Sequence, residues 1–565
     1  MKHLMTGAAT ALLLLASAHL HPATAQSWAW ANAASTTPNA ESWAEKVAFD
    51  AAGNAVVAGH FSGTLVLGRH TLVSAGGEDV FVARVDATGD WAQAVRAGGP
   101  ADDYAMGLAV APDGTATVVG GFESKLATFG SFVLPNSGSN SSTQDVFIAR
   151  LSPAGVWTQA ARAGGQGHDH ATAVALAPDG TATVVGGFQG PTAAFAGTLL
   201  RNTTLAGGFE DVFVARFSAA GLWTRAISAG SADTDHANAV AVAPDGSAVV
   251  VGTFYGEKIA LGTKLVSNST GNSGPADVFV ARLTPAGDWD RAAGLGGSAN
   301  DEGFGVALHA NGDATVVGSF ASPTLTVGPA TLTNNTPGNT MYTDVFVARL
   351  SAAGTWTQAV SAGGNRYDWL NSVAVDAQDR AVVAGSFTST SFTAGMLMLS
   401  NTTAPTTHNE VLVGTLDANG HWSSLCRAGG PQLDIATSVA YSPLGRVVVA
   451  GVIHGPAAQF GPTTLVAAKP AAFVASLGQL PLTSRPAATA TLALGLAPNP
   501  AHGSVRVSLP ATAAATPLQV LDATGRELRR LAAMPGRETT LDLSGLAPGL
   551  YLLRAGAATG RLLVE

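Results

Sequence analysis

The amino-acid sequence predicts an all-β fold, and three observations support this prediction. A strand-like motif, "DVFVAR" in its clearest form, recurs along the chain in seven copies. Turn signals rich in Gly, Pro and Asp separate short apolar runs within each copy, and long amphipathic helical patterns are nearly absent. The 565 residues include 67 Gly and 47% hydrophobic but only 12% charged residues, a composition typical of a folded protein with many turns.

The copies are evenly spaced. The motif begins at Asp79, Asp145, Asp211, Asp277 and Asp344, and in degenerate form at Glu410 and Ala471. A tryptophan accompanies each copy at steps of 61 to 67 residues: Trp30, Trp91, Trp157, Trp223, Trp289, Trp356 and Trp422. Self-similarity at such a period indicates a repeat architecture in which each copy is one structural unit.

Each repeat is expected to contain four short strands. In "ATAVALAPDGTATVVGGF" a Pro-Asp-Gly turn joins two apolar runs, because Gly tolerates positive φ and Asp bonds back to its own backbone. A second hairpin surrounds "SPAG" in "DVFVARLSPAGVWTQAARAGG". The run from Val80 to Ala83 is apolar on both faces, which predicts a strand that is covered above and below.

Radially stacked sheets cover both faces of such strands, and the ends of the repeat region predict how the stack closes. The first unit starts in the middle, with "SWAWANAAS" at residues 27–35, and its missing partner strand occurs near Ala471 as "AAFVASL". Pairing these two segments predicts a closed seven-bladed β-propeller over residues 26–478. An open β-solenoid is the alternative architecture.

The first 25 residues have the pattern of a secretory signal peptide. Lys2 precedes an apolar run from Ala8 to Ala16, and a small-x-small cleavage pattern ends at Ala25. No other apolar run approaches the roughly 20 residues of a transmembrane helix, so no transmembrane segment is predicted. An exported protein is therefore expected.

A second, smaller domain is expected at the other end. Residues 479–492 form a Pro/Ala/Thr-rich linker, and residues 493–565 follow with alternating apolar positions such as Val505, Val507, Leu541 and Leu543. This pattern predicts about six or seven short strands in a small Ig-like β-sandwich.

Both regions resemble known bacterial families. The repeats resemble SBBP-type β-propeller repeats in the pattern "FG...L", "G..D.FVAR", "G.W" and "G.F". The C-terminal module resembles the type A sorting domain of the type IX (Por) secretion system of Bacteroidota, with the matching residues Pro498, Asn499, Pro500, Gly503, Gly549 and Tyr551. This resemblance implies the type IX machinery as a partner and a secreted or cell-surface location.

Six repeats place an aspartate before the apolar pair of one strand, and the seventh has Ser42 instead: Asp103, Asp169, Asp235, Asp301, Asp368 and Asp434. A ring of carboxylates at one channel mouth could bind a cation. Alternatively, each aspartate caps a turn or bonds a neighbouring backbone. The structural interpretation is favoured, because the residue repeats with the fold.

Irregular residues are better candidates for a site. His170, Asp235 and His236 lie at equivalent places in adjacent repeats, and imidazole with carboxylate is a ligand set for a divalent transition metal. Solvated loop residues are the alternative, because no third spacing supports the set. No other cofactor is predicted.

The sequence predicts no catalytic residues. It contains no nucleophile elbow, no H-E-x-x-H motif and no phosphate loop, and its single cysteine, Cys426, aligns with the small residue Ala161. The formal charge of −9, without a Lys/Arg cluster, argues against nucleic-acid binding.

The expected function is therefore that of an exported, non-enzymatic scaffold or adhesion-like binding module with an unidentified surface glycan or protein ligand. The alternative is a secreted glycan-active hydrolase or lyase with its site at a channel mouth. That alternative requires a cluster of unrepeated His, Tyr, Arg and acidic residues at one mouth. Such a cluster is not evident in the sequence, which has only six Tyr.

Overall fold

The computed structural model describes most of the chain in two separate units. They divide as Met1–Leu480 and Pro481–Glu565. The described residues are 27–478 apart from 38, 139–142, 205–207 and 404–407, and 494–564 apart from 509–516, 522–526, 533–535 and 556–557. The expected signal peptide (1–25) lies outside these residues, and so does the expected linker (479–492). Every regular element within them is a β-strand, and no helix there could cross a membrane.

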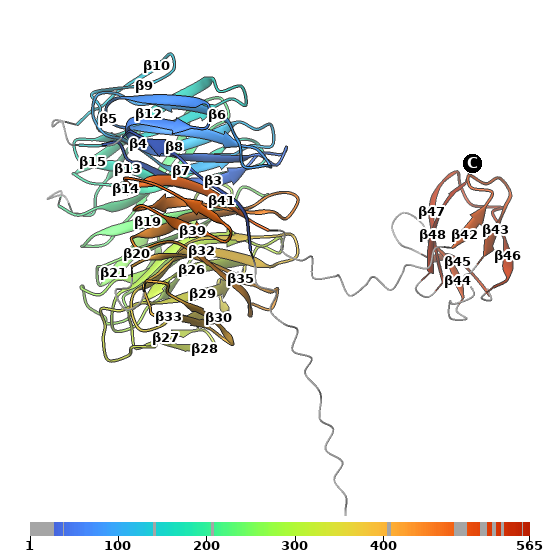
Figure 1. The fold of residues 1–565 in the computed structure, drawn as a ribbon. Helices are drawn as coiled ribbons and strands as arrows, with labels where there is room; N and C mark the ends of the chain where they lie inside the picture. The colour runs from blue at the N-terminus through green and yellow to red at the C-terminus, as the bar shows by residue number, and fades with distance from the viewer. Residues whose placement is uncertain are drawn as a thin grey trace, which may run out of the picture. The chain divides into compact units, whose positions relative to one another are not determined.

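One antiparallel four-strand pattern recurs in the first unit (Figure 1). Sheet 1 contains β3 (Ser42–Phe49), β4 (Ala55–Leu67), β5 (His70–Val85) and β6 (Trp91–Ala97), and sheet 2 contains β7 (Asp103–Val110), β8 (Ala116–Phe122), β11 (Asp145–Leu151) and β12 (Trp157–Gly165). Sheet 3 contains β13 (Asp169–Leu176), β14 (Ala182–Phe188), β17 (Asp211–Phe217) and β18 (Trp223–Ala229). The long strands β4 and β5 of sheet 1 also form an outer hairpin, to which β2 (Ser35–Thr36) pairs.

The same pattern continues through the rest of the unit. Sheet 4 contains β19 (Asp235–Val242), β20 (Ala248–Phe254), β23 (Asp277–Leu283) and β24 (Trp289–Leu295). Sheet 5 contains β25 (Asp301–Leu308), β26 (Ala314–Phe320), β29 (Asp344–Leu350) and β30 (Trp356–Ala362), and sheet 6 contains β31 (Asp368–Val375), β32 (Ala381–Phe387), β35 (Glu410–Leu416) and β36 (Trp422–Ala428). Sheet 7 contains β37 (Asp434–Tyr441), β38 (Val447–Ile453), β41 (Ala471–Leu477) and β1 (Trp28–Ala33).

Sheet 7 combines the two ends of the repeat region. Strand β1 pairs antiparallel with β41, which is the pairing that the sequence predicts for "SWAWANAAS" and "AAFVASL". The first strands of successive sheets pack on one another in chain order, and β37 of sheet 7 packs on β3 of sheet 1. We call this last contact the seam.

The central strands are buried on both faces, as their apolar patterns predict. All seven residues of β8 and of β14 are buried. One core cluster joins Val56 and Val82 of sheet 1 to Val118 and Phe147 of sheet 2, and similar clusters join other neighbouring sheets. Each fully buried Val or Phe contributes about 1.5–3 kcal/mol, so the spaces between the sheets form the core of this unit.

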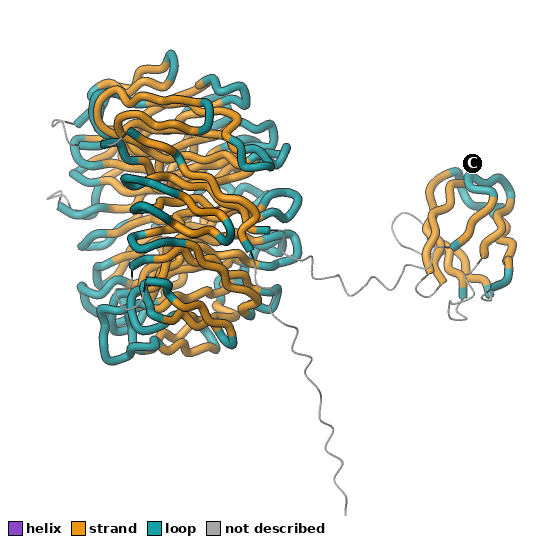
Figure 2. The backbone as a smooth tube through the Cα atoms, in the orientation of Figure 1, coloured by secondary structure: helices purple, strands orange, loops and turns teal. Residues whose placement is uncertain are grey.

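Loops gather along two opposite sides of this unit, as Figure 2 shows. One side carries the tight turns after the first strand of each sheet, such as residues 177–181, and we call it the turn end. The other side, where each first strand begins, carries the additional hairpins, and we call it the hairpin end. These hairpins are β9–β10 (Leu126–Phe129, Phe132–Pro135), β15–β16 (Thr192–Phe195, Thr198–Arg201), β21–β22 (Lys258–Leu261, Lys264–Ser267), β27–β28 (Thr324–Val327, Ala330–Thr333), β33–β34 (Ser391–Ala394, Leu397–Ser400) and β39–β40 (Ala458–Phe460, Thr463–Leu465).

The second unit consists of two small antiparallel sheets around one core. One contains β42 (Gly495–Ala497), β43 (Ser504–Ser508) and β46 (Glu538–Asp542). The other contains β44 (Leu518–Leu521), β45 (Glu527–Leu531), β47 (Gly549–Ala555) and β48 (Ala558–Val564). Val505, Val507 and Leu541 from the first sheet pack with Leu518 and Leu553 from the second.

Candidate functional site

The turn end is a repeated structural device. Arg150 on β11 donates hydrogen bonds to the carbonyl oxygens of Gly180 and Ala219 in turns of the next sheet, at 2.8 Å each. Arg216 makes the equivalent bond to the carbonyl oxygen of Gly246 at 3.0 Å. These arginines come from the "DVFVAR" motif, and so does Arg84, which donates to the carbonyl oxygen of Gly114, so the last residue of the motif ties neighbouring sheets together at these three junctions.

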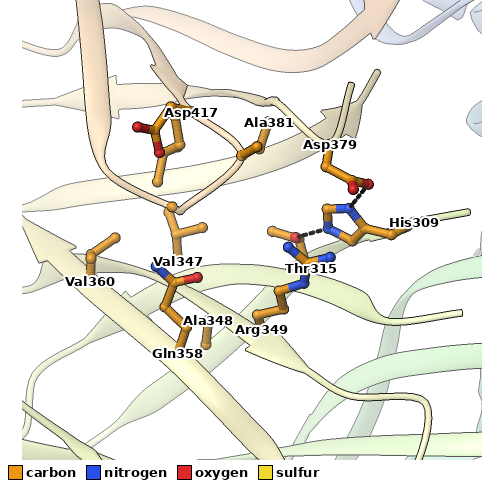
Figure 3. A pocket seen from close by; sticks show the side chains of 13 residues that line it. His309, Thr315, Val347, Ala348, Arg349, Gln358, Val360, Asp379, Ala381 and Asp417 are labelled. Atoms are coloured by element: carbon orange, nitrogen blue, oxygen red, sulfur yellow. Dashed lines mark hydrogen bonds and ion pairs between the residues drawn. The ribbon is translucent and has the colours of Figure 1, made fainter. Parts of the chain in front are cut away.

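A small pocket at the turn end between sheets 5 and 6 serves the same purpose (Figure 3). His309 Nδ1 lies 2.8 Å from Asp379 Oδ1 of the next sheet, and its Nε2 lies 2.7 Å from Thr315 Oγ1. Val347, Val360 and Ala381 are among the other residues that line the pocket, together with Arg349 and Gln358. Because both imidazole nitrogens have partners, we assign His309 to the junction between these sheets rather than to a ligand site.

The repeated aspartates are buried and bond to their own loops. All six are 0% exposed, and so is Ser42. Asp103 accepts hydrogen bonds from Gly99 N at 2.7 Å and Ser124 Oγ at 2.8 Å, and Asp169 accepts one from Gly165 N at 2.5 Å. Burial raises the pKa of Asp103 to about 7 and that of Asp169 to about 8. The carboxyl groups therefore hold the loop that leads into each first strand.

Of the metal candidates, His170 and His236 meet at one carboxylate, that of Glu210, whereas Asp235 bonds within its own loop. Asp235 is fully buried and accepts a hydrogen bond from Ser231 N at 2.6 Å. His170 and His236 instead share Glu210, with Nδ1 to carboxylate distances of 3.9 and 3.0 Å. The hydrogen bond to Glu210 raises the pKa of His236. No group of three metal-binding side chains occurs among the described residues.

The polar loops before each "DVFVAR" copy begin with a structural residue. Asn202, Asn268, Asn334 and Asn401 open equivalent loops and are at most 4% exposed. Asn268 Nδ2, for example, donates to the carbonyl oxygen of Pro275 at 2.7 Å across its own loop. These asparagines therefore shape the loops at the hairpin end.

The unrepeated residues of the first unit meet at the hairpin end. The second residue of each first strand varies around the unit and takes five residue types, in the order Trp43, Tyr104, His170, His236, Glu302, Trp369 and Ile435. Acidic and aromatic residues from nearby loops and strand ends join them. We call this set, together with His60, Glu78, Asp102, Glu210, Tyr255, Tyr342, Tyr367 and His454, the mouth cluster.

The part of the mouth cluster on sheets 1 and 2 is aromatic and acidic. The rings of Trp43 and His60 are stacked with centroids 6.3 Å apart, and Tyr104 meets His60 edge-on at 5.0 Å. The nitrogens of His60 lie 4.0 Å from Glu45 and 3.9 Å from Glu78. His454 of sheet 7 packs edge-on against Trp43 at 5.3 Å, so the contacts cross the seam.

The mouth cluster continues through the remaining sheets. Glu210 pairs with His236, and the Tyr255 hydroxyl donates to Glu302 at 3.4 Å. On sheets 5 and 6, Tyr367 stacks on Trp369 at 5.5 Å and meets Tyr342 edge-on at 5.1 Å.

This arrangement corrects the expectation that no cluster of unrepeated polar residues exists. Four of the six tyrosines belong to the mouth cluster, although they come from four different repeats. The sequence carries a usable signal, since the residue after each repeated aspartate varies while its neighbours stay constant. That signal is weak along the chain, because the varying residues are about 66 positions apart and each is flanked by repeated ones.

Residues of the sorting motif bond to strands and turns of the second unit, and Asn499 among them bonds the C-terminal strand. Asn499 Oδ1 accepts a hydrogen bond from Leu563 N at 2.9 Å, and Ala501 N donates to Leu563 O at 2.9 Å. Gly503 has a positive φ of 70°, and its carbonyl oxygen accepts from Leu543 N. The Tyr551 hydroxyl donates to the carbonyl oxygen of Ala547 at 2.7 Å.

Comparison with known families identifies this second unit. Residues 496–563 match the family described as the secretion system C-terminal sorting domain. The chain is exported by type IX secretion. Its destination is the cell surface or the extracellular space, and the match supports an origin in Bacteroidota. No curated protein matches the chain.

Solved structures with low sequence identity also resemble this chain. A protein of unknown function from Dyadobacter fermentans is 10% identical, with a TM-score of 0.37, over 80% of this chain and 99% of the other. A gluconolactonase from Xanthomonas campestris is 12% identical, with a TM-score of 0.27, over 65% and 90%. Sqt1 from Chaetomium thermophilum is 11% identical, with a TM-score of 0.35, over 78% and 96%. These similarities concern the fold alone.

Proposed function

We propose that this exported protein is a closed seven-bladed β-propeller of SBBP-type repeats, which binds a ligand at its hairpin end without chemical conversion. Closure is supported by the seam, where Thr437 Oγ1 donates to the carbonyl oxygen of Ala44 at 2.6 Å. Asn371 makes the equivalent bond to Ala436 O at 2.9 Å between sheets 6 and 7. The seam is therefore bonded like an ordinary junction.

The observation that carries the binding function is the mouth cluster. Its aromatic rings, imidazoles and carboxylates gather where the repeat is broken. Partly exposed aromatic residues together with hydrogen-bonding groups are common in ligand sites. The sorting domain delivers this site to the outside, where a surface glycan or a protein is the expected ligand class.

A glycan and protein array tests this function with the full chain. The double variant Tyr367→Ala/Trp369→Ala removes a stacked pair at the hairpin end and should weaken binding by about tenfold or more. Leu444→Ala is the matched control, because Leu444 is 86% exposed at the turn end. Equal loss of binding in both variants would contradict a site at the hairpin end.

The second candidate function is that of a secreted glycan-active hydrolase or lyase. It is favoured by Glu210, whose carboxylate is shared by two imidazoles in the mouth cluster. Incubating the full chain with any glycan that it binds distinguishes the two functions. Intact glycan after prolonged incubation supports the binding module, and shortened products support the enzyme.

A further inference from the structure

Resting on the proposed function, we infer that the mouth cluster at sheets 1 and 2 binds a protonated organic amine. The evidence is an acidic set that forms no ion pair with Lys or Arg in the described part of the chain, a buried imidazole directed into it, and two flanking aromatic rings. The acidic set consists of Glu78 and Asp102 of the mouth cluster together with Glu41, Glu45 and Glu123, which interact electrostatically with Glu78 or Tyr104.

The charges of this set are poorly compensated. No Lys or Arg forms an ion pair with any of the five acids in the described part of the chain, whereas Asp79 pairs with Arg96 at 2.8 Å in the same sheet. Lys46 is the only cation on β3, and it interacts electrostatically with Glu45. Burial and the neighbouring carboxylates of Asp102 and Glu41 raise the pKa of Glu78. An external cation would relieve this repulsion.

His60 is the second observation. It is only 8% exposed and lies between Glu45 and Glu78, yet its Nδ1 makes no hydrogen bond among the described residues. Burial lowers the pKa of His60 to about 4, so the imidazole is neutral at pH 7 and does not neutralise the acids. A buried nitrogen without a partner, directed into an acidic set, points to a missing hydrogen-bonding ligand.

The chemistry of the flanking groups selects an organic cation over a metal ion. Trp43 and Tyr104 are half-buried, and the ring of each packs against His60. Aromatic faces attract ammonium groups, and carboxylates accept their hydrogen bonds. Among the described residues, the carboxylates and imidazole do not form a group able to hold a metal ion. The side chains of Glu45 and Glu78 are 18% and 24% exposed, so solvent reaches them.

Calorimetric titration of the full chain tests this inference with two matched probes. The trimer of glucosamine carries protonated amines, and its fully N-acetylated form does not. We expect the amine form to bind at least about tenfold more tightly, and more weakly as NaCl rises from about 50 to about 500 mM. Spermidine is a further probe. If spermidine binds, the amine is sufficient for binding. If the glucosamine trimer binds and spermidine does not, the sugar also contributes to binding.

Variants localise the site. Glu78→Gln/Asp102→Asn removes two charges and should weaken binding of the glucosamine trimer about tenfold or more. The new amide at position 102 keeps an oxygen that can accept the bond from Glu78 N, which is 2.8 Å long with Asp102. Trp43→Ala should weaken binding by about tenfold. Glu257→Gln, at an exposed acid beside the hairpin of sheet 4, is the control and should change nothing.

Three results would overturn the inference. The first is equal affinity for the amine and N-acetylated trimers. The second is unchanged affinity of Glu78→Gln/Asp102→Asn for the glucosamine trimer. The third is that neither amine probe binds, while Ca²⁺ raises the melting temperature of the unmodified protein but not that of this variant. If the array finds another ligand that depends on Tyr367 and Trp369 but the amine probes fail, only this inference fails. The proposed binding function would stand.

Discussion

The two ends of the first unit use the same repeats differently. At the turn end, Arg150 and Arg216 make the same bonds at successive junctions. At the hairpin end, equivalent positions carry Trp43, His170 and Glu302. A residue that holds the stack together must recur at each junction, whereas a ligand site needs different groups side by side. Repetition therefore marks the contacts that stabilise the stack, and the variable positions at the hairpin end carry the proposed ligand site.

At the seam the repeated residue is replaced, but the stabilising contacts are kept. Ser476 on β41 occupies the position of the repeated arginine. Arg446, from the adjacent turn, instead donates to the carbonyl oxygens of Gly53 and Ala87 across the seam. The guanidinium also lies 5.4 Å from the Phe49 ring, much as Arg150 lies 5.5 Å from Phe217. A different residue thus restores the turn-end device.

The largest effect is expected from removing the strand that completes sheet 7. Deleting residues 27–35 should remove the pairing of β1 with β41 and the buried Trp28, whose loss alone costs about 3–5 kcal/mol. The melting temperature should fall by well over about 5 °C. Removing everything after Gly478 should have far less effect on the melting of the first unit. Circular dichroism measures the melting of both deletion variants. If the two variants melt at the same temperature, closure at the seam is contradicted.

A smaller loss of stability is expected from single arginine substitutions, which compare the seam with an ordinary junction between sheets. Arg446→Ala and Arg150→Ala should each lower the free energy of unfolding by roughly 1.5–3 kcal/mol, because each removes charge-assisted bonds to two carbonyls. Urea unfolding measures both. Arg201→Ala, on an exposed hairpin position, should change it by less than about 0.5 kcal/mol. If Arg446→Ala behaves like Arg201→Ala, the seam is not held as the other junctions are.

The repeated aspartates predict a pH effect on stability. Burial raises the pKa of Asp169 from its ordinary 3.8 to about 8, so the folded state holds a proton that the unfolded state has lost. The stability that this proton contributes should be greatest near and below about pH 4 and fall until about pH 8. Asp169→Asn resembles the protonated acid and should reduce the difference in melting temperature between about pH 5 and about pH 8.5 by a few degrees.

An exposed aspartate provides the control for this comparison. Hydrogen bonds from Thr181 lower the pKa of Asp179, so its stabilising contribution is lost only as the pH falls through that lowered value. Asp179→Asn should leave the difference between the two pH values unchanged. If Asp169→Asn also leaves the difference in melting temperature between the two pH values unchanged, Asp169 is ionised in the folded state.

The smallest expected effect is a change in the pKa of one imidazole in the mouth cluster. Glu210→Gln should lower the pKa of His236, because the hydrogen bond and the charge of Glu210 raise it while burial lowers it. Two-dimensional NMR of the imidazole measures this change. Glu257→Gln should leave the pKa unchanged, and an unchanged value in Glu210→Gln would remove Glu210 from the electrostatics of the cluster.

Much of the fold was predictable because it follows from local patterns. Apolar runs such as Val80 to Ala83 predicted strands covered on both faces, and Pro-Asp-Gly turns predicted hairpins. The metal candidates were less predictable, because the sequence does not show that Asp235 turns into its own loop while Glu210 reaches His236.

The sequence by itself determined the all-β class, the period of the repeats, the pairing of its two ends and the sorting domain, since these depend on residues close in the chain or on whole motifs. Only the tertiary structure decided which irregular residues meet. Trp43 and His454 are distant in sequence, yet their rings lie 5.3 Å apart, because β37 packs on β3 and His454 bonds to Asp434 at the start of β37. A site assembled from residues of several repeats leaves only a weak signal along the chain, the variable position after each repeated aspartate.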